Sequence, residues 1–305
     1  MAFIKEKKKG ATFYYELVES VREGGKARQR TVKYLGNREK MLEYCKRHGV
    51  KHPAQKYAML EPGTAFLLES RLKRLDSLRP LPPNTVASLA KKFDVDMTYN
   101  SNAIEGNRLS LKETYLVLEK GITIGGRTMR EHLEATNHRE AIRLLRKIAD
   151  RRAGITEKDV LALHALILDR IEPQNAGFYR HEQVFITQSE HRPPRWQEVP
   201  KLMKEVVAEL NSKRGGAAAV ESAVKIHHLI AWIHPFVDGN GRMARLLSNL
   251  RLLRAGFPPM VLRKKVRKSY YDALESADEG DFRPLSSMVA KELLAALDLW
   301  ISAAG

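Results

Sequence analysis

The stretch that decides the fold of this 305-residue chain is His234-Pro235-Phe236-Val237-Asp238-Gly239-Asn240-Gly241-Arg242-Met243-Ala244-Arg245. It combines an imidazole, a carboxylate, an amide between two glycines, and two arginines three residues apart. These groups amount to an acid/base side chain beside a set of anion-binding donors. The stretch therefore predicts a site where a proton moves next to a bound phosphate.

The residues on either side of this stretch predict two helices. Apolar side chains recur with helical spacing over 221–233 and again over 243–253. Because Pro235 disfavours a helical conformation of the residue before it, we expect the first helix to end at an extended His234. Residues 238–241 should then form a turn that leads into the second helix.

The end of this turn has the composition of an anion site. Gly239 and Gly241, on either side of Asn240, let a ligand approach backbone amides at a helix N-terminus. Arg242 and Arg245 are spaced i and i+3 and should project from the same turn. Their planar guanidinium groups can each donate two hydrogen bonds to a phosphate.

The other two polar residues suit proton transfer and metal binding. Asp238 can hold Mg²⁺, which needs only one or two protein carboxylates when phosphate oxygens supply other ligands. His234 has an ordinary pKa of about 6.5, so a neutral ring could accept a hydroxyl proton.

The stretch resembles the motif of the Fic family, HPFx[DE]GNGRxxR, and matches it at every fixed position. The resemblance implies a mainly α fold: a Fic-type helical domain with a short β-hairpin flap. Fic proteins typically transfer AMP from ATP to a hydroxyl of a target protein. The chain itself is also a candidate substrate. By this resemblance His234 is the general base, Asp238 binds Mg²⁺ and residues 239–241 cradle the phosphates. Arg242 and Arg245 then hold the β- and γ-phosphates.

An upstream segment resembles the inhibitory motif of that family, [ST]xxxE[GN]. It contains Ser101 and Glu105, which are spaced i and i+4 on one predicted helix and precede Gly106. In such relatives the Glu pairs with the second arginine of the motif, here Arg245, and occupies the space of the γ-phosphate. In some relatives the same Glu positions a water that removes AMP, so the reverse reaction is a second candidate activity.

Residues 177–194 interrupt the helices and resemble the Fic flap, a short β-hairpin at the border of the active site. Val184, Phe185 and Ile186 are its candidate docking residues. An exposed edge there can pair with an extended target segment and bring its hydroxyl to His234. An ordinary surface hairpin is the alternative.

The N-terminal region predicts a separate small domain. β-Branched and aromatic residues over 13–18 and 31–35 surround a turn signal at Gly24-Gly25, so 11–36 should form a β-hairpin, followed by a helix over 37–47. The hairpin is similar to one at the N-terminus of some transposases. Residues 1–60 hold fifteen Lys and Arg against six Asp and Glu, about half of the net charge of +17. Nucleic-acid contact, protein docking and packing on the larger domain stay open.

Three residues carry the signal of a helix N-cap. Ser110, Thr128 and Thr156 each precede a helical pattern and an acidic residue in the first turn. We expect helices to begin directly after them.

The chain as a whole predicts three parts: a basic domain over 1–60, an N-terminal helical part over 61–125 and the Fic core over 126–305. No apolar run is long enough for a membrane span, and the N-terminus lacks an apolar signal core. The single cysteine, Cys45, excludes an internal disulfide. We therefore expect a cytoplasmic protein without a membrane partner, and a second copy of the chain is a candidate partner.

Two other functions fit the same residues. One is a nucleic-acid-binding regulator whose working part is the basic domain over 1–60, with AMP transfer acting mainly on the chain itself. The other keeps the Fic fold but transfers a different phosphate-linked group, such as UMP or phosphocholine.

Overall fold

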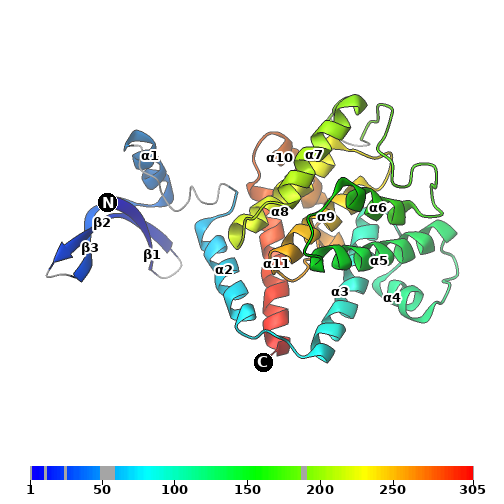
Figure 1. Ribbon diagram of the computed structural model, residues 1–305, viewed down its shortest axis with the longest axis horizontal. Coiled ribbons are helices and arrows are strands. Elements are labelled where there is room, and N and C mark those ends of the chain that lie inside the picture. Colours follow the sequence, from blue (N-terminus) through cyan, green and yellow to red (C-terminus); the bar gives the residue numbers. More distant parts are fainter. Residues whose placement is uncertain (1, 10–11, 24–25, 49–58, 187–190, 305) are drawn as a thin grey trace. The chain divides into compact units, whose positions relative to one another are not determined.

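The computed structural model describes residues 2–9, 12–23, 26–48, 59–186 and 191–304. The chain divides into two units, Met1–Leu67 and Leu68–Gly305, and the boundary falls inside α2 (Pro62–Asp76). Figure 1 shows a small sheet with one helix in the first unit and a bundle of helices in the second. The finer division into three segments, inferred from the sequence, stays a prediction beside these two units.

The first unit is a three-stranded antiparallel sheet with a helix packed on it. β1 (Ala2–Lys9), β2 (Thr12–Glu23) and β3 (Lys26–Gly36) are hydrogen-bonded in that order. α1 (Arg38–His48) packs on β2 and β3. Their shared apolar core consists of Ile4, Tyr15, Leu17, Leu35, Met41 and Cys45.

The predicted hairpin and helix of this unit are confirmed as β2, β3 and α1, whereas β1 is not predicted. Its lysine-rich sequence has low strand propensity, and the strand exists because its backbone pairs with β2 from Ala2 opposite Glu19 to Lys9 opposite Thr12. An ion pair of 2.7 Å between Lys7 and Glu16 joins the same two strands. The turn expected at Gly24-Gly25 lies outside the described residues.

The second unit is a helical bundle arranged around α9. Its helices are α3 (Pro83–Ile104), α4 (Leu111–Lys120), α5 (Met129–Asp150), α6 (Glu157–Leu168), α7 (Val199–Leu210), α8 (Ala217–Ile233), α9 (Asn240–Arg254), α10 (Arg267–Asp278) and α11 (Arg283–Ala304), with 3-10 turns η2 (Trp196–Glu198) and η3 (Lys264–Val266). α9 contacts α3, α5, α6, α7 and α8. In the described part of the chain, no helix has both the length and the apolar composition to cross a bilayer.

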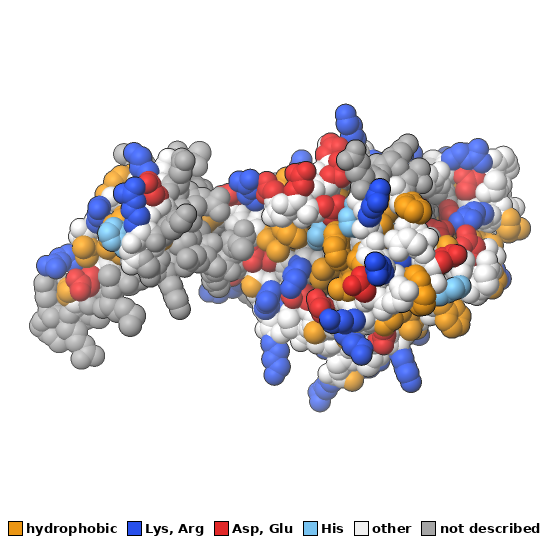
Figure 2. Space-filling model, turned by 90° about the horizontal axis from the view of Figure 1, so that it is seen from above, with side chains coloured by type: hydrophobic (Ala, Val, Ile, Leu, Met, Phe, Trp, Pro, Cys, Tyr) orange, Lys and Arg blue, Asp and Glu red, His pale blue; other side chains and the backbone are white. Residues whose placement is uncertain are grey.

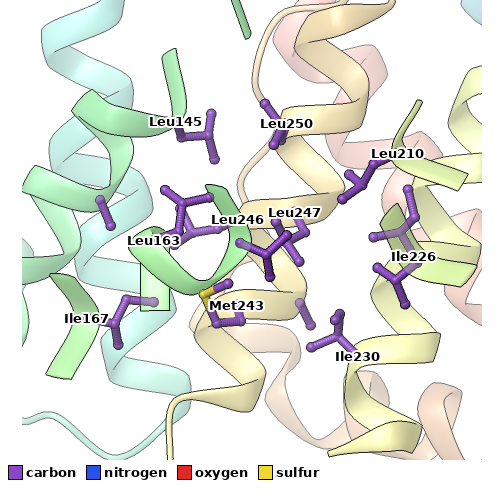
Figure 3. Close-up of a cluster of buried hydrophobic side chains, with 14 of the residues drawn as sticks. Leu145, Leu163, Ile167, Leu210, Ile226, Ile230, Met243, Leu246, Leu247 and Leu250 are labelled. Atoms are coloured by element: carbon purple, nitrogen blue, oxygen red, sulfur yellow. The ribbon is translucent and has the colours of Figure 1, made fainter. Parts of the chain in front are cut away.

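The core of this unit is built around the apolar side chains of α9. Met243, Leu246, Leu247 and Leu250 are fully buried. Figure 3 shows them between leucine and isoleucine side chains from α5 and α6 on one side and from α7 and α8 on the other. The first turn of α9 carries the predicted anion site, so this packing fixes the position of that site.

The three predicted N-caps are confirmed, and each is a complete capping box. The side chain of the cap accepts a hydrogen bond from the amide three residues on, and the acidic side chain there accepts one from the cap amide. The pairs are Ser110 with Glu113, Thr128 with Glu131, and Thr156 with Asp159.

The predicted flap connects α6 to η2. Its described residues, 177–186 and 191–194, contain no assigned strand, and its tip, 187–190, lies outside the described residues. Phe185 is 80% exposed, while Val184 and Ile186 are half-buried. The β-hairpin form of the flap therefore stays a prediction.

We expect Leu247→Ala to destabilise the protein by about 2–5 kcal/mol, because it removes a fully buried side chain from the centre of the bundle. The matched control is Leu111→Ala at a side chain that is 43% exposed, which should cost much less. Urea unfolding of both variants measures the difference. Equal decreases in stability would contradict the central place given to α9.

Candidate active site

His234 lies at the junction between α8 and the turn. The helix ends at Ile233, as predicted, but His234 has a left-handed conformation (φ 49°, ψ 58°) and not the extended one we expected. The following proline disfavours the right-handed helical region for His234, and the left-handed conformation that His234 adopts lies outside that region. The amide of His234 still donates to the carbonyl of Ile230 at 3.1 Å.

Arg180 holds this left-handed residue in place. Such a conformation costs about 1–3 kcal/mol and persists only where its surroundings impose it. The guanidinium of Arg180, 2% exposed, donates from Nε to the carbonyl of His234 at 2.8 Å, and the Arg180 amide donates to the carbonyl of Pro235 at 2.9 Å. Its other N–H groups bind the carbonyls of Glu182 and Pro194. The sequence marks Arg180 only as part of the flap segment, and nothing in the pattern signals this role.

The imidazole of His234 is neutral over the physiological pH range. Burial lowers its pKa to about 4. Its Nδ1 lies 3.3 Å from the carbonyl oxygen of Ala231, and because a carbonyl can only accept a hydrogen bond, Nδ1 carries the proton. This leaves Nε2 with a free lone pair, which is the form that accepts a proton.

Asp238 is surrounded by donors. Its Oδ1 accepts from the amide of Gly239 at 2.5 Å, and its Oδ2 lies 2.8 Å from Arg130 and 3.2 Å from Arg242. Burial alone would raise the pKa of Asp238, but Arg242, the Gly239 amide and Arg130 more than offset it, so the pKa lies below its usual value. The carboxylate is therefore ionised at neutral pH.

The side chains of Asn240 and His164 hold the backbone of the turn between α8 and α9. The sequence analysis did not assign this role to either residue. Asn240 accepts from the amide of Phe236 at 3.0 Å and donates to its carbonyl at 2.8 Å. His164 on α6 accepts at Nδ1 from the amide of Gly177, so its Nε2 carries the proton that it donates to the carbonyl of Asp238 at 3.0 Å. Its ring also stacks on the ring of Phe236, with 3.6 Å between the ring centroids. In the sequence, His164 stands out only as a single histidine among the apolar residues of α6.

The two arginines of α9 are buried and keep donors without protein partners. Arg242 is 3% exposed and Arg245 is 4% exposed. Within the described part of the chain, Nε of Arg242 and Nη1 of Arg245 have no hydrogen-bond partner. Buried, unsatisfied guanidinium donors are costly, and an anion bound at the helix N-terminus would satisfy them. The arrangement fits a phosphate group.

Glu105 and Ser101 bind the second of these arginines. Nη2 of Arg245 lies 2.6 Å from Oε1 of Glu105, and Nε donates to Oγ of Ser101 at 2.8 Å. The carboxylate of Glu105 also packs directly on Gly241, where a Cβ would collide with it. The predicted contact between the upstream segment and Arg245 is thus present in the structure, and it needs a glycine at position 241.

A cavity of about 540 Å³ lies beside His234 and the start of α9. It is lined by Glu105, His234, Asn240 and Gly241, by Ile186 of the flap segment, and by residues of α10 that include Tyr270 and Tyr271. This volume is typical of a small-molecule site. Four of the predicted site residues with large or charged side chains do not line it: Phe185, Asp238, Arg242 and Arg245. Val184 does not line it either.

Comparison with known proteins decides the family. The profile of the Fic/DOC family matches residues 154–252. The solved structure of Fic-1 from C. elegans is 30% identical, its alignment covers 88% of this chain and 78% of that chain, and its TM-score is 0.71. The chain belongs to the Fic family. A Fic-domain-containing signalling protein from Bacteroides thetaiotaomicron also matches, with 28% identity, 78% and 96% coverage and a TM-score of 0.71.

Curated Fic relatives carry the name protein adenylyltransferase Fic. The one from Nematostella vectensis is 37% identical over 206 residues, which are 67% of this chain and 48% of that protein. The one from Drosophila melanogaster is 36% identical over 240 residues, 76% of this chain and 48% of that protein. The chain spans about half the length of these relatives. A second profile, the IS1634 family transposase N-terminal domain, matches residues 3–51.

The Fic site can therefore be compared with the residues predicted for it. The structure brings the predicted base, the glycine turn, both arginines and the inhibitory pair together within one bundle. It adds Arg130, Arg180 and His164, which the sequence did not assign to the site. Among the described residues, no three His, Cys, Asp or Glu side chains form a metal cluster.

We expect the ring of His234 to titrate near pH 4 in this Fic protein and not near 6.5, because burial disfavours its charged form. NMR titration of the histidine ring signals measures this, and His234→Asn identifies the signal. As pH falls below about 6.5, the unfolded chain binds the proton first, so stability decreases toward pH 4. A midpoint at or above 6.5 would contradict the burial argument.

Proposed function

We propose that this protein transfers AMP from ATP to a Ser, Thr or Tyr hydroxyl of a target protein. What supports it most is that a neutral imidazole, a glycine-rich helix N-terminus and a carboxylate brake share one cavity. The curated relatives named protein adenylyltransferase support the same reaction.

In the proposed reaction, Nε2 of His234 accepts the proton of the target hydroxyl. The hydroxyl oxygen forms a bond to the α-phosphorus of ATP, the bond from that phosphorus to the bridging oxygen breaks, and pyrophosphate leaves. The pKa of His234 is low in the free protein, and the nearby negative charge of the triphosphate raises it toward the working pH.

The phosphates would be held by the first turn of α9. The amides of Asn240 and Gly241 contribute from the backbone, because the amide of Gly239 donates to Asp238 and the side chain of Asn240 is bound to Phe236. Arg242 and Arg245 supply the unsatisfied donors. Such preorganised donors stabilise the charge that develops on the leaving group.

Asp238 would hold Mg²⁺. It fits this role as a single ionised carboxylate beside a phosphate site, which is the kind of coordination Mg²⁺ accepts. When bound, the metal neutralises phosphate charge.

Glu105 would inhibit this reaction by occupying the place of a phosphate on Arg245. The ion pair of 2.6 Å keeps that guanidinium from binding the γ-phosphate, and Ser101 holds the arginine in the same orientation. ATP could then bind, but without its α-phosphate placed for attack. Glu105 also lines the cavity, so we propose removal of AMP by a water that it positions as a second activity.

The segment 184–186 would dock the target. Ile186 lines the cavity beside His234, and Phe185 is exposed. Backbone pairing between an extended target segment and residues 184–186 would position the hydroxyl of the target.

We expect Glu105→Gly to raise incorporation of label from α-³²P-ATP with Mg²⁺, including into the chain itself. If the closed state is favoured by ~2.7 kcal/mol, only about 1% of molecules are competent, so the gain can approach 100-fold. Adding His234→Ala should abolish the labelling.

The matched control is Glu279→Gly, because Glu279 also follows the last turn of a helix and precedes a glycine, but is exposed and does not line the cavity. It should label like the unchanged protein. If Glu105→Gly stays unlabelled with ATP but accepts label from UTP or CDP-choline, the adenylyl donor is wrong and a different phosphate-linked group is transferred.

Nucleic-acid binding by the first unit is a second candidate function. It is favoured by the transposase N-terminal profile over residues 3–51. Arg30, Lys33 and Tyr34 are exposed along β3, and Tyr34 contacts the ring of Tyr14. Lys and Arg side chains, in blue, stand out on the described part of this unit in Figure 2. Basic side chains among aromatic ones suit a phosphate backbone and bases.

We expect the full chain to bind labelled DNA with an affinity that falls steeply as salt rises. Arg30→Gln with Lys33→Gln should weaken binding and reduce the slope of log affinity against log salt by about one for each phosphate that is no longer neutralised. Lys201→Gln, at an exposed position of the second unit, serves as control. Binding that is insensitive to salt or unchanged in the double variant would refute this function.

A further inference from the structure

Arg130 forms an ion pair with the carboxylate to which the metal was assigned. It lies in the first turn of α5, and its Nη2 is 2.8 Å from Oδ2 of Asp238. Neither the base, the anion site nor the inhibitory segment needs this contact. Its charge stands next to the oxygen that a divalent cation would use.

The surroundings of Arg130 allow it to leave Asp238. Its Nε lies 3.2 Å from Oε1 of Glu134, and its Nη1 lies 3.3 Å from Oε1 of Glu172. If the contact with Asp238 breaks, two carboxylates still neutralise the guanidinium. The side chain is 51% exposed, so water can replace the broken hydrogen bond.

The other arginine on Asp238 is not displaceable in this way. Arg242 also reaches Oδ2, at 3.2 Å, but its side chain is only 3% exposed and it lies four residues from Asp238 at the start of α9. Its burial in the bundle keeps it in place. Arg130 comes from a different helix, and its exposure leaves room for it to move away from Asp238.

We propose that Arg130 occupies the cation position at Asp238 and competes with the divalent metal for it. The inference rests on the proposed function, because it takes Asp238 as the metal ligand. Since the metal can bind only after the guanidinium of Arg130 has left Oδ2, the ion pair of Arg130 with Asp238 lowers the apparent affinity for the metal. The protein then holds the metal mainly when the phosphates of a nucleotide add their own ligands.

The test is the binding of Mn²⁺ to the full chain with Glu105→Gly, in the presence of α,β-methylene-ATP. The electron paramagnetic resonance signal of free Mn²⁺ measures binding without any turnover. Adding Arg130→Gln should tighten Mn²⁺ binding by about two- to fivefold, the range expected from an exposed ion pair. Arg130→Lys, which keeps the charge, should have an affinity for Mn²⁺ closer to that of the parent protein.

Arg143→Gln is the matched control, because Arg143 is an exposed arginine of the same helix that pairs with Glu140. It removes the same charge without touching Asp238 and should bind Mn²⁺ like the parent. An equal gain in this control, or no gain in Arg130→Gln, would overturn the inference. Weaker nucleotide binding by Arg130→Gln would overturn it too, and would make Arg130 a phosphate ligand.

Asp238→Asn separates this failure from failure of the proposed function. If Asp238→Asn abolishes Mn²⁺ binding while Arg130→Gln leaves it unchanged, only the competition is refuted. If Asp238→Asn binds Mn²⁺ as well as the parent, the metal assignment within the proposed function is refuted.

Discussion

The site depends on one constraint: the buried guanidinium of Arg245 needs an anion. The side chain is 4% exposed because α9 passes through the centre of the bundle, and an unpaired buried charge is strongly destabilising. Glu105 supplies the anion in this structure, at 2.6 Å. In the proposed function, a phosphate at the N-terminus of α9 would take the place of Glu105.

In the proposed function, this constraint would link binding and inhibition through a single arginine. A ligand could shift the equilibrium away from the ion pair of Glu105 with Arg245 only by the difference between its binding free energies to the two states. Gly241 allows the contact with Glu105, because the absence of a side chain lets the carboxylate rest on the backbone. By our proposals, Arg130 would compete with a metal at Asp238, and Glu105 would compete with a phosphate at Arg245. In both cases a charged side chain from another part of the chain would take the place of the ligand.

The helices of the bundle could be predicted because their signals are local. Capping boxes at Ser110, Thr128 and Thr156 and the apolar spacing around 221–253 depend on residues a few positions apart. β1 could not be predicted, since a lysine-rich strand forms only through its pairing with β2. The same holds for the conformation of His234, which Pro235 restricts but Arg180, far away in the chain, selects.

The sequence by itself determined which chemical groups are present: an imidazole, a carboxylate, a glycine turn and two arginines within twelve residues, and Glu105 far upstream. Local spacing places the first five together, whereas Glu105 reaches them only through the fold. Only the tertiary structure decided what each group touches. The contacts of Asp238 with Arg130 and of the turn with His164 join segments far apart in the sequence. They arise from how the helices pack around α9, and no local pattern encodes them. The contact of Arg245 with Glu105 was implied by the resemblance of the upstream motif, but only the fold brings the two side chains together.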